Sequence, residues 1–379
     1  MKLFHLADLH IGKRYNELSL IDDQQYILNQ ILCLCDGEKP DGVIIAGDVY
    51  DKSVPSAEAV ELFDRFLNSL TERNLKVFIV SGNHDSAERV AFGSKLMRAS
   101  GVYVSPVYGG EVKPVVLSDN FGEVNFWLLP FIKPATVRRF FEGREIDGYT
   151  AAVDAAVGAM NIEEEKRNVL VAHQFVTGSV RSGSEELVVG DIGNVDAAVF
   201  RQFDYVALGH VHRAQNIGSE RVRYCGTPLK YSLSEADDVK SVTVVALGEK
   251  GSVTVTAIPL KPLRDVREIR GAYEELTKRS FYGGADFCND LLHIVLTDEE
   301  EITDALAKLR LVYPNVMSLR YDNARTQKNA GAEAFEALPA RSPLELFSSL
   351  YEAQNNAEMS DKQRELICAL IEKAWGDEI

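Results

Sequence analysis

The sequence has few cysteines, no long apolar run and a deficit of positive charge. Its five cysteines are scattered and include no Cys-x-x-Cys pair, which predicts buried thiols of a reducing compartment and excludes a disulfide framework or a thiolate zinc site. No apolar run approaches the roughly 18 residues of a membrane helix, and the first residues lack the cleavage site of a signal peptide. We therefore expect a cytoplasmic protein without membrane contact.

Acidic residues outnumber basic ones, with 57 Asp plus Glu against 41 Lys plus Arg, so the formal net charge is −16. That sign argues against a general polyanion binder that works by bulk attraction. It leaves open a nucleic acid bound through a metal centre and a local basic strip. Hydrophobic residues make up 46% of the 379 residues and charged residues 26%, which is typical of a folded globular protein with one large domain and smaller additions.

The first part of the chain alternates short apolar runs with stretches of helical spacing, as in 21–35 and 56–70. The runs expected as strands are 3–7, 42–46, 76–80, 124–129, 167–172 and 205–208. Three further strands, 222–225, 241–247 and 253–258, follow without helices between them, and we expect them to form an edge of the second sheet. The pattern predicts a layered α/β sandwich of two β-sheets flanked by helices, with active residues where the strands end.

The chain changes in character after Pro262, so residues 1–262 are expected to form the main domain. Residues 263–321 contain a β-α-β-α-β pattern that predicts a small α+β capping domain, with helices near 272–279 and 301–312. Residues 322–341 are poor in large apolar side chains and predict a linker. Residues 342–379 contain two helix start signals and two apolar stripes, which predict two C-terminal helices that either bind a partner or fold back on the parent domain.

Five of the seven histidines occur at the ends of predicted strands, each beside Asp, Asn, Gly or another His. The motifs are Asp8-Leu9-His10, Gly47-Asp48, Gly82-Asn83-His84-Asp85, Ala172-His173 and Gly209-His210-Val211-His212. Asp8 and His10 are two apart on a segment expected to be extended, so both side chains can reach one ion. A preceding glycine allows the tight turn that directs a polar side chain into a cleft. Each motif alone is commonplace, but five in order predict a metal centre.

The donor types restrict the metal. Carboxylate, amide and imidazole groups without thiolate suit Mn, Fe, Co, Ni or Zn, and the set is too rich in nitrogen for Mg or Ca. Two Asp, one Asn and four His are too many for one ion, which predicts two divalent ions that share a carboxylate. Such a pair clamps a phosphate and lowers the pKa of a bound water.

These motifs resemble the signature of the calcineurin-like metallophosphoesterases. Within that superfamily the chain is most similar to the SbcD family, the nuclease subunits of bacterial SbcC–SbcD DNA repair complexes. The similarity also includes the segments 7–12, 226–232, 264–267 and 342–347. It therefore covers essentially the whole chain.

The resemblance implies two ions that share Asp48, with Mn²⁺ favoured. The first ion would also be held by Asp8, His10 and His212, and the second by Asn83, His173 and His210. His84 would stabilise charge at the scissile phosphate or protonate the leaving oxygen, with Asp85 as a candidate orienting partner. Some relatives carry a histidine three places after the bridging Asp, where this chain has Asp51, so the role of that histidine is not transferred.

The resemblance also implies an activity and its partners. Members act as 3′-to-5′ double-strand exonucleases and single-strand or hairpin endonucleases, driven by the SbcC ATPase, in DNA end processing, repair, recombination and replication. Duplex ends and hairpins would be the substrates. The chain would form a homodimer within a heterotetramer, and residues 342–379 would grip the base of the SbcC coiled coil.

Two other functions stay open. A phosphatase or a small-molecule phosphodiesterase would use the same fold, although the run Gly47-Asp48-Val49-Tyr50-Asp51-Lys52-Ser53 lacks the arginine of the protein-phosphatase pattern Gly-Asp-x-x-Asp-Arg-Gly. Fold alone does not fix the substrate. A DNA-end-binding scaffold with an unimportant metal site is the third possibility, and the complete set of ligand residues argues against it.

Several residues outside the motifs have two interpretations. Arg264, Arg267 and Arg270 are expected to share one face of a strand, where they would contact DNA phosphates or guard a solvated edge. Lys230 and Tyr231 follow a Gly-Thr-Pro turn and would either contact substrate or pack the loop. His5 and His293 lie away from the motifs, and we expect both to be structural.

Overall fold

The computed structural model describes residues 1–15, 18–180, 182, 194–324 and single positions or short stretches between 344 and 370. The chain forms two compact units, residues 1–322 and 323–379. Most of the predicted C-terminal helices in 342–379 and most of the predicted linker 322–341 lie outside the described residues. Among the helices that are described, none has the length and apolar character needed to cross a bilayer.

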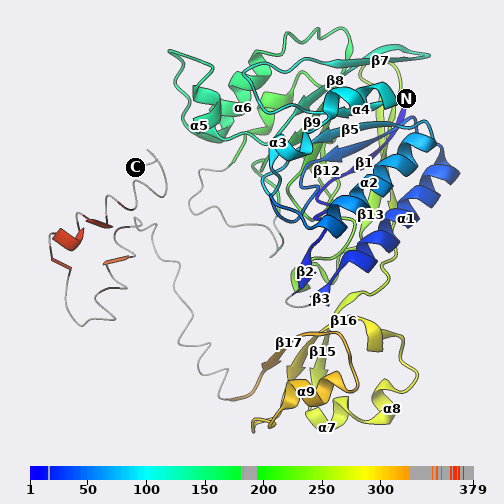
Figure 1. Ribbon diagram of the computed structural model, residues 1–379, viewed down its shortest axis with the longest axis vertical. Coiled ribbons are helices and arrows are strands. Elements are labelled where there is room, and N and C mark those ends of the chain that lie inside the picture. The colour runs from blue at the N-terminus through cyan, green and yellow to red at the C-terminus, as the bar shows by residue number, and fades with distance from the viewer. Residues whose placement is uncertain are drawn as a thin grey trace. The chain divides into compact units, whose positions relative to one another are not determined.

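The core of the first unit is a sandwich of two six-stranded sheets (Figure 1). The first sheet has the order β14-β13-β1-β4-β5-β6, and its strands are β1 (Lys2–Leu6), β4 (Gly42–Ala46), β5 (Lys76–Val80), β6 (Val102–Val104), β13 (Ser241–Leu247) and β14 (Val253–Pro259). The second sheet has the order β11-β12-β10-β9-β8-β7, and its strands are β7 (Val115–Asp119), β8 (Gly122–Leu129), β9 (Arg167–His173), β10 (Tyr205–Gly209), β11 (Gln215–Ile217) and β12 (Ser219–Tyr224). The predicted layered α/β class is confirmed.

Helices cover the outer face of each sheet. Helices α1 (Ile21–Glu38) and α2 (Ala57–Glu72) pack on the first sheet, and α5 (Pro134–Arg138) and α6 (Gly148–Gly158) pack on the second (Figure 1). The helical spacing places Ile27 and Ile31 of α1 in the core, where they are 1% and 0% exposed. Apolar side chains also fill the space between the two sheets. There the rings of Phe78 and Phe126 stack with their centroids 4.0 Å apart. The chain thus builds four layers, helix–sheet–sheet–helix.

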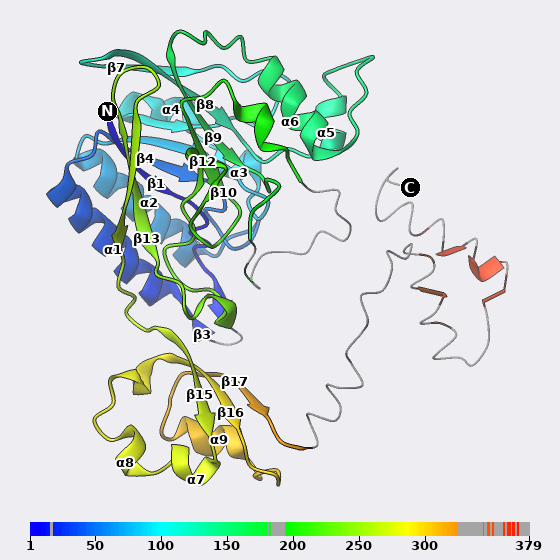
Figure 2. The same cartoon turned by 180° about the vertical axis from the view of Figure 1, so that it is seen from behind.

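The expectation for the last strands of the sandwich was partly wrong. Only β12 joins the second sheet, where it pairs with β10. Strand β13 instead pairs antiparallel with β1, and β14 pairs with β13, so both extend the first sheet (Figure 2). The reason is that β1 is otherwise an open edge of the parallel sheet, and β13 satisfies its free backbone groups. The chain therefore crosses from one sheet to the other between β12 and β13.

A smaller three-stranded parallel sheet follows, made of β15 (Val266–Gly271), β16 (Leu291–Leu296) and β17 (Val316–Tyr321). The helix expected near 272–279 is two short helices, α7 (Tyr273–Leu276) and α8 (Arg279–Tyr282), and the helix expected over 301–312 is limited to α9 (Ala305–Arg310). The remaining short elements are β2 (Arg14–Tyr15), β3 (Leu18–Ser19), α3 (Ala87–Val90) and α4 (Ser94–Met97), with 3₁₀ turns at Arg98–Ser100, Ala197–Phe200, Leu233–Glu235 and Asp286–Asn289.

The cysteines within the described residues are free, and they differ in exposure. Cys35 and Cys225 are buried, whereas Cys33 is exposed and Cys288 is intermediate. The expectation of buried thiols therefore holds for Cys35 and Cys225 and is wrong for Cys33, which lies on the outward side of α1.

Candidate metal centre

The motif residues meet at one edge of the sandwich. Parallel strands end at the same edge of a sheet, so the residues that follow β1, β4 and β5 lie beside those that end or follow β9 and β10. The first sheet supplies Asp8, His10, Asp48, Asn83 and His84, and the second supplies His173, His210 and His212. Three groups of their ligand atoms each lie within 4.8 Å: Asp8 with His10 and His212, His10 with Asp48 and His84, and Asp8 with Asp48 and His173.

The backbone at these positions is unusual. The angle φ is +52° at Asp8, +43° at His10, +48° at Asp48 and +102° at His210. Positive φ is costly for residues with a side chain and concentrates at functional sites. The expectation of an extended segment from Asp8 to His10 was therefore wrong, and left-handed turns direct these two side chains toward the cluster.

The glycines of the motifs act mainly through close packing. A Cβ atom at Gly82 would lie 2.1 Å from Oδ1 of Asp48, and one at Gly209 would lie 1.9 Å from the carbonyl oxygen of Ala46. Gly47 has φ of +88°, and its Cβ would lie 2.3 Å from Nδ1 of His173. The two sheets thus approach one another at the cluster as closely as their backbones allow.

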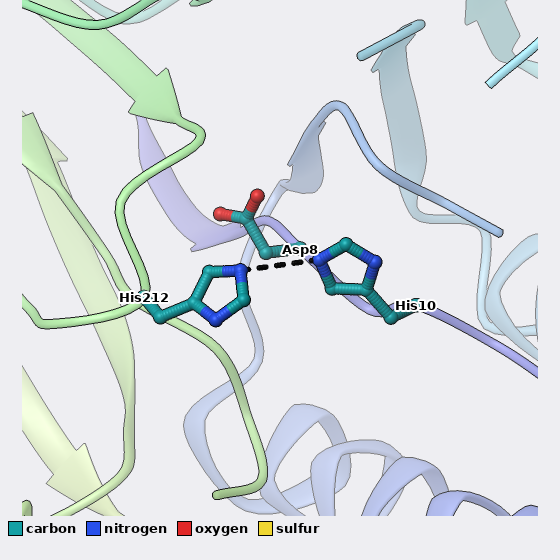
Figure 3. A group of neighbouring side chains, drawn as sticks. All are labelled: Asp8, His10 and His212. Carbon is teal, nitrogen blue, oxygen red and sulfur yellow. Dashed lines mark hydrogen bonds between the residues drawn. The ribbon is translucent and has the colours of Figure 1, made fainter. Parts of the chain in front are cut away.

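Two histidines from different sheets face one another on one side of the cluster. Nε2 of His10 lies 3.2 Å from Nε2 of His212, and Asp8 lies beside them (Figure 3). Both rings are buried, and burial lowers the pKa of His10 well below its usual value. A neutral ring offers a lone pair, so this arrangement suits a cation bound near both nitrogens.

The other side of the cluster is built around Asn83 and His173. Oδ1 of Asn83 lies 3.0 Å from Nε2 of His173 and 2.9 Å from Nδ1 of His210. Nδ1 of His173 lies 2.8 Å from the carbonyl oxygen of Ala46. Nδ1–H donates to that carbonyl, so Nε2 is the nitrogen that faces Asn83 and Asp48 and that would bind an ion once it has lost its proton.

Asp48 lies between the two sides. Its Oδ2 is 3.3 Å from Nε2 of His173 and 3.8 Å from Nε2 of His10. Burial opposes ionisation of Asp48, but the charge and hydrogen bond of His173 outweigh it and lower the pKa of Asp48 below its usual range. Burial raises the pKa of the second carboxylate, Asp8, to about 6. Two buried carboxylates among imidazoles fit divalent cations, because the cations offset the cost of burying both charges.

His84 is more exposed than His10 and His173. Its side chain is 21% exposed, while those of His10 and His173 are 1% and 0% exposed. Its backbone N–H donates to Oδ1 of Asp48 at 2.9 Å, and its Nδ1 lies 3.1 Å from the carbonyl oxygen of Asp51. Nε2 is 4.0 Å from Oδ2 of Asp48. His84 thus presents one ring nitrogen at the open rim of the cluster.

Within the part of the chain that the structure describes, the Asp85 carboxylate does not make the expected orienting contact with the His84 ring. The Asp85 carboxylate instead accepts from the backbone N–H groups of Val49, Tyr50 and Gly82 at 3.1, 3.0 and 2.9 Å. Burial, with the charge of Asp48, raises the pKa of Asp85 to about 6. Asp85 therefore joins the loops after β4 and β5, and the Asp51 carbonyl holds the His84 ring.

Residues behind the ligands hold the loops in place. Tyr231 is 3% exposed, and its hydroxyl donates to the carbonyl oxygen of Leu9 at 2.5 Å, which supports loop packing over substrate contact. Nε2 of Gln24 donates to the carbonyl oxygen of His10 at 2.7 Å. Glu235 is buried 3.5 Å from Nδ1 of His212. No sequence pattern points to Gln24 or Glu235, since neither stands at a strand end or beside a motif glycine.

The three arginines at and before β15 lie in ion pairs. Arg264 forms a two-pronged pair with Asp23 of α1, which is 2% exposed, and its Nε–Oδ1 distance is 3.0 Å. Arg267 pairs with Asp290 at 3.3 Å, and Arg270 pairs with Asp322. The expectation of one shared face was wrong, because residues three apart in β15 point to opposite faces and Arg264 precedes the strand. Lys230 pairs with Asp265 at 2.9 Å.

Residues 1–214 match the calcineurin-like phosphoesterase family, and residues 262–355 match the type 5 capsule protein repressor C-terminal domain. The chain is 36% identical over 323 residues to the SbcD subunit of the SbcCD nuclease of Staphylococcus epidermidis, which covers 84% of this chain and 85% of that protein. The chain belongs to the SbcD family of calcineurin-like phosphoesterases.

A second relative agrees with this assignment. The SbcD subunit of the SbcCD nuclease of Staphylococcus saprophyticus is 35% identical, with 84% of each chain covered. Among solved structures, a dimetal phosphatase from Danio rerio covers 69% of this chain and 98% of its own, with 12% identity and a TM-score of 0.42. A likeness of that size adds nothing to the family assignment, which depends on the sequence matches.

Proposed function

We propose that the chain is a metal-dependent DNA nuclease subunit that acts with the SbcC ATPase. The observation that carries the proposal is the convergence of seven ligand-type side chains at one edge of the sandwich, in a chain whose relatives are named nuclease subunits. One ion would be held by Asp8, His10, Asp48 and His212, and the other by Asp48, Asn83, His173 and His210. The oxygen and nitrogen donors are compatible with Mn²⁺, which is the ion that the family resemblance implies.

The residues around the ligands have separate roles in phosphodiester hydrolysis. When bound, the two ions supply charge that polarises the phosphate and lowers the pKa of a coordinated water. His84 stands at the exposed rim and is suited to stabilise charge on the phosphate or to donate a proton to the leaving oxygen. The Asp51 carbonyl orients its ring, and Asp85 fixes the loop that carries it.

We further propose a division of labour along the chain, within a cytoplasmic complex that works in DNA repair, recombination and replication. Residues 1–262 would hydrolyse DNA, and residues 263–321 would form a capping domain. Residues 322–341 would connect this cap to residues 342–379, which would dock on the base of the SbcC coiled coil. Deletion of 342–379 should leave a folded, metal-loaded enzyme that no longer co-purifies with SbcC. Full SbcC affinity in the truncated chain would contradict the docking role.

Two finer assignments belong to the same proposal. A homodimer within a heterotetramer agrees with exposed apolar side chains on the segment after His84, such as Phe92 and Leu96, which are 85% and 81% exposed. We propose DNA contact for Arg267 and Arg270, whose side chains are 45% and 54% exposed. We exclude Arg264 because its guanidinium is paired with the buried Asp23. Neutralising Arg267 and Arg270 should flatten the salt dependence of duplex binding, by about one in slope per lost phosphate contact.

The deciding experiment compares two substrates. The wild-type chain with Mn²⁺, with and without SbcC, is incubated with linear duplex DNA and with a small phosphate ester, and the variant Asp48→Asn serves as the control. We expect duplex digestion from the 3′ ends and cleavage of hairpins, both lost in Asp48→Asn. Ester hydrolysis without any DNA degradation, even with SbcC present, would instead support the phosphatase or small-molecule phosphodiesterase alternative.

A further inference from the structure

Behind His212 lies a buried polar cluster that the ligand assignment does not use. It consists of Thr227, Glu235 and Lys240, which come from the segment between β12 and β13 and are 0%, 0% and 7% exposed. A buried carboxylate costs several kcal/mol unless it is paired and hydrogen-bonded. The chain nevertheless places Glu235 against a proposed metal ligand.

Both oxygens of Glu235 are engaged. Oε2 accepts from Nζ of Lys240 at 2.5 Å and from Oγ1 of Thr227 at 3.2 Å. Oε1 accepts from Oγ of Ser232 at 3.3 Å and lies 3.5 Å from Nδ1 of His212. The carboxylate is therefore fixed by three neighbours from its own segment and directs one oxygen at the imidazole.

The same segment also holds the backbone of His212. The carbonyl oxygen of His212 accepts from Nζ of Lys240 at 2.9 Å and from the backbone N–H of Thr227 at 3.1 Å. A Cβ atom at Gly226, where φ is +75°, would lie 2.7 Å from that carbonyl oxygen. The segment 226–240 thus contacts both the main-chain carbonyl and the ring of His212.

The orientation of the ring gives these contacts a consequence. Nε2 of His212 faces His10, and the other ring nitrogen points away from Asp8 and His10 (Figure 3). A neutral imidazole has one N–H and one lone pair. If Nδ1 donates to Glu235, the lone pair is on Nε2, where the first ion would bind.

We propose that Glu235 is the positioning residue of His212, which selects the Nδ1–H tautomer and makes Nε2 a better ligand for the first ion. Carboxylates behind metal-binding histidines have this effect. The inference rests on the proposed metal-dependent function and concerns one ion. On the other side of the cluster the Ala46 carbonyl holds His173, so the second ion should not depend on Glu235.

The test is a calorimetric titration of the full chain with Mn²⁺. We expect Glu235→Ala to lower the affinity of one of the two sites by about 10- to 100-fold and to leave the other unchanged. Glu235→Gln keeps an acceptor oxygen without the charge, so its affinity should lie between those of the wild type and Glu235→Ala. That partial rescue separates an effect on the ligand from a general loss of packing.

Asp204 provides the matched control. It is 4% exposed, its Oδ2 lies 2.9 Å from Nζ of Lys250, and it stands at the start of β10, at the end of that strand opposite His210. Asp204→Asn should lower the melting temperature and leave both Mn²⁺ affinities unchanged.

Two outcomes would contradict the role of Glu235, and a third would separate it from the proposed nuclease function. Folded Glu235→Ala or Glu235→Gln with two unchanged sites would contradict it, and so would an equal loss of affinity in Asp204→Asn. If Glu235→Ala does not fold, Glu235→Gln alone decides. If Glu235→Gln weakens one site while the wild type cuts no DNA, the proposed nuclease function fails and the role of Glu235 stands.

Discussion

Histidines are buried in different ways at the strand ends and in the strand interiors. At the strand ends, the ring of His10 faces that of His212, the ring of His173 faces that of His210, and Asp8 and Asp48 lie beside them. In the strand interiors, His5 of β1 and His293 of β16 each bond to a hydroxyl group: Nδ1 lies 2.9 Å from Oη of Tyr205 and 2.7 Å from Oγ of Ser318, respectively. Both regions are buried, so burial alone does not identify a metal ligand.

The backbone separates the two regions. Four strand-end positions, Asp8, His10, Asp48 and His210, adopt positive φ, and glycines without room for a side chain pack against Asp48 and His173. His5 and His293 instead lie within strands β1 and β16 and do not adopt positive φ. Each of these interior histidines has a strand neighbour on each side, and its Nδ1 bonds to one hydroxyl group. A strand-end histidine stands where two sheets meet and can share a cation with residues from both. The difference predicts that changes in one region affect metal and activity, and changes in the other affect stability alone.

The largest effect is expected for Asp48→Asn at the strand ends. Asp48 lies between the two sides of the cluster, so both ions should weaken together. Charge stabilisation by the metal centre is worth several kcal/mol, which corresponds to a loss of DNA hydrolysis of about 10³-fold or more. Elemental analysis after dialysis should find less than one ion per chain. His212→Ala should retain one ion, and equal losses in the two variants would contradict the shared role of Asp48.

The next largest effect is expected for His84→Ala. His84 touches the cluster only at its rim, so both ions should be retained while hydrolysis falls by about 10²- to 10⁴-fold. Metal content and initial rate are measured on the same preparation. A parallel loss of metal and activity would show that His84 is a ligand and would move it into the group of buried strand-end histidines.

His5 in the strand interior should respond to pH and not to metal. Burial, with the nearby charge of Arg223, lowers the pKa of His5 to about 3. Because the unfolded chain binds this proton below about pH 6.5 and the folded chain does not, the contribution of His5 to stability is lost as the pH falls below 6.5. From pH 7 to pH 5 the free energy of unfolding should fall by about 2 kcal/mol more in the wild type than in His5→Asn. Identical pH slopes would show that His5 is protonated in the fold.

The smallest effect is expected for His293→Ala in the small domain. The variant loses the hydrogen bond to Ser318 and an edge-on contact with the Tyr15 ring. One such hydrogen bond contributes about 1 kcal/mol to the free energy of unfolding. Chemical denaturation should show this loss, with two Mn²⁺ sites of unchanged affinity. A change in Mn²⁺ affinity would contradict the claim that histidines in the strand interiors affect stability alone.

Much of the fold and the identity of the cluster could be predicted from the sequence. Buried parallel strands such as 42–46 and 76–80 are continuous apolar runs that end at glycine or polar residues, so both their limits and the polar residues after them are visible. The pairing of β13 with β1 could not be predicted, because a run such as 241–247 fits the edge of either sheet. The left-handed turns at Asp8 and His10 were also hidden, since no glycine stands at those positions.

The surroundings of the cluster were harder to predict than its ligands. The family resemblance implied Asp85 as an orienting partner of His84, yet its carboxylate bonds to backbone groups of two loops. The arginines 264, 267 and 270 looked like a phosphate strip, yet their carboxylate partners come from residues far apart in sequence, such as Asp23. Spacing along the chain identifies residues of one motif, and it does not show contacts that tertiary structure creates.

The most direct test of the account is the number of Mn²⁺ ions bound per chain in the wild type, His212→Ala and His5→Asn, measured by calorimetric titration. The account predicts two ions for the wild type, one for His212→Ala and two for His5→Asn. A single ion in the wild type, or the same loss in His5→Asn as in His212→Ala, would contradict the claim that the strand ends, and not the strand interiors, form a two-metal centre.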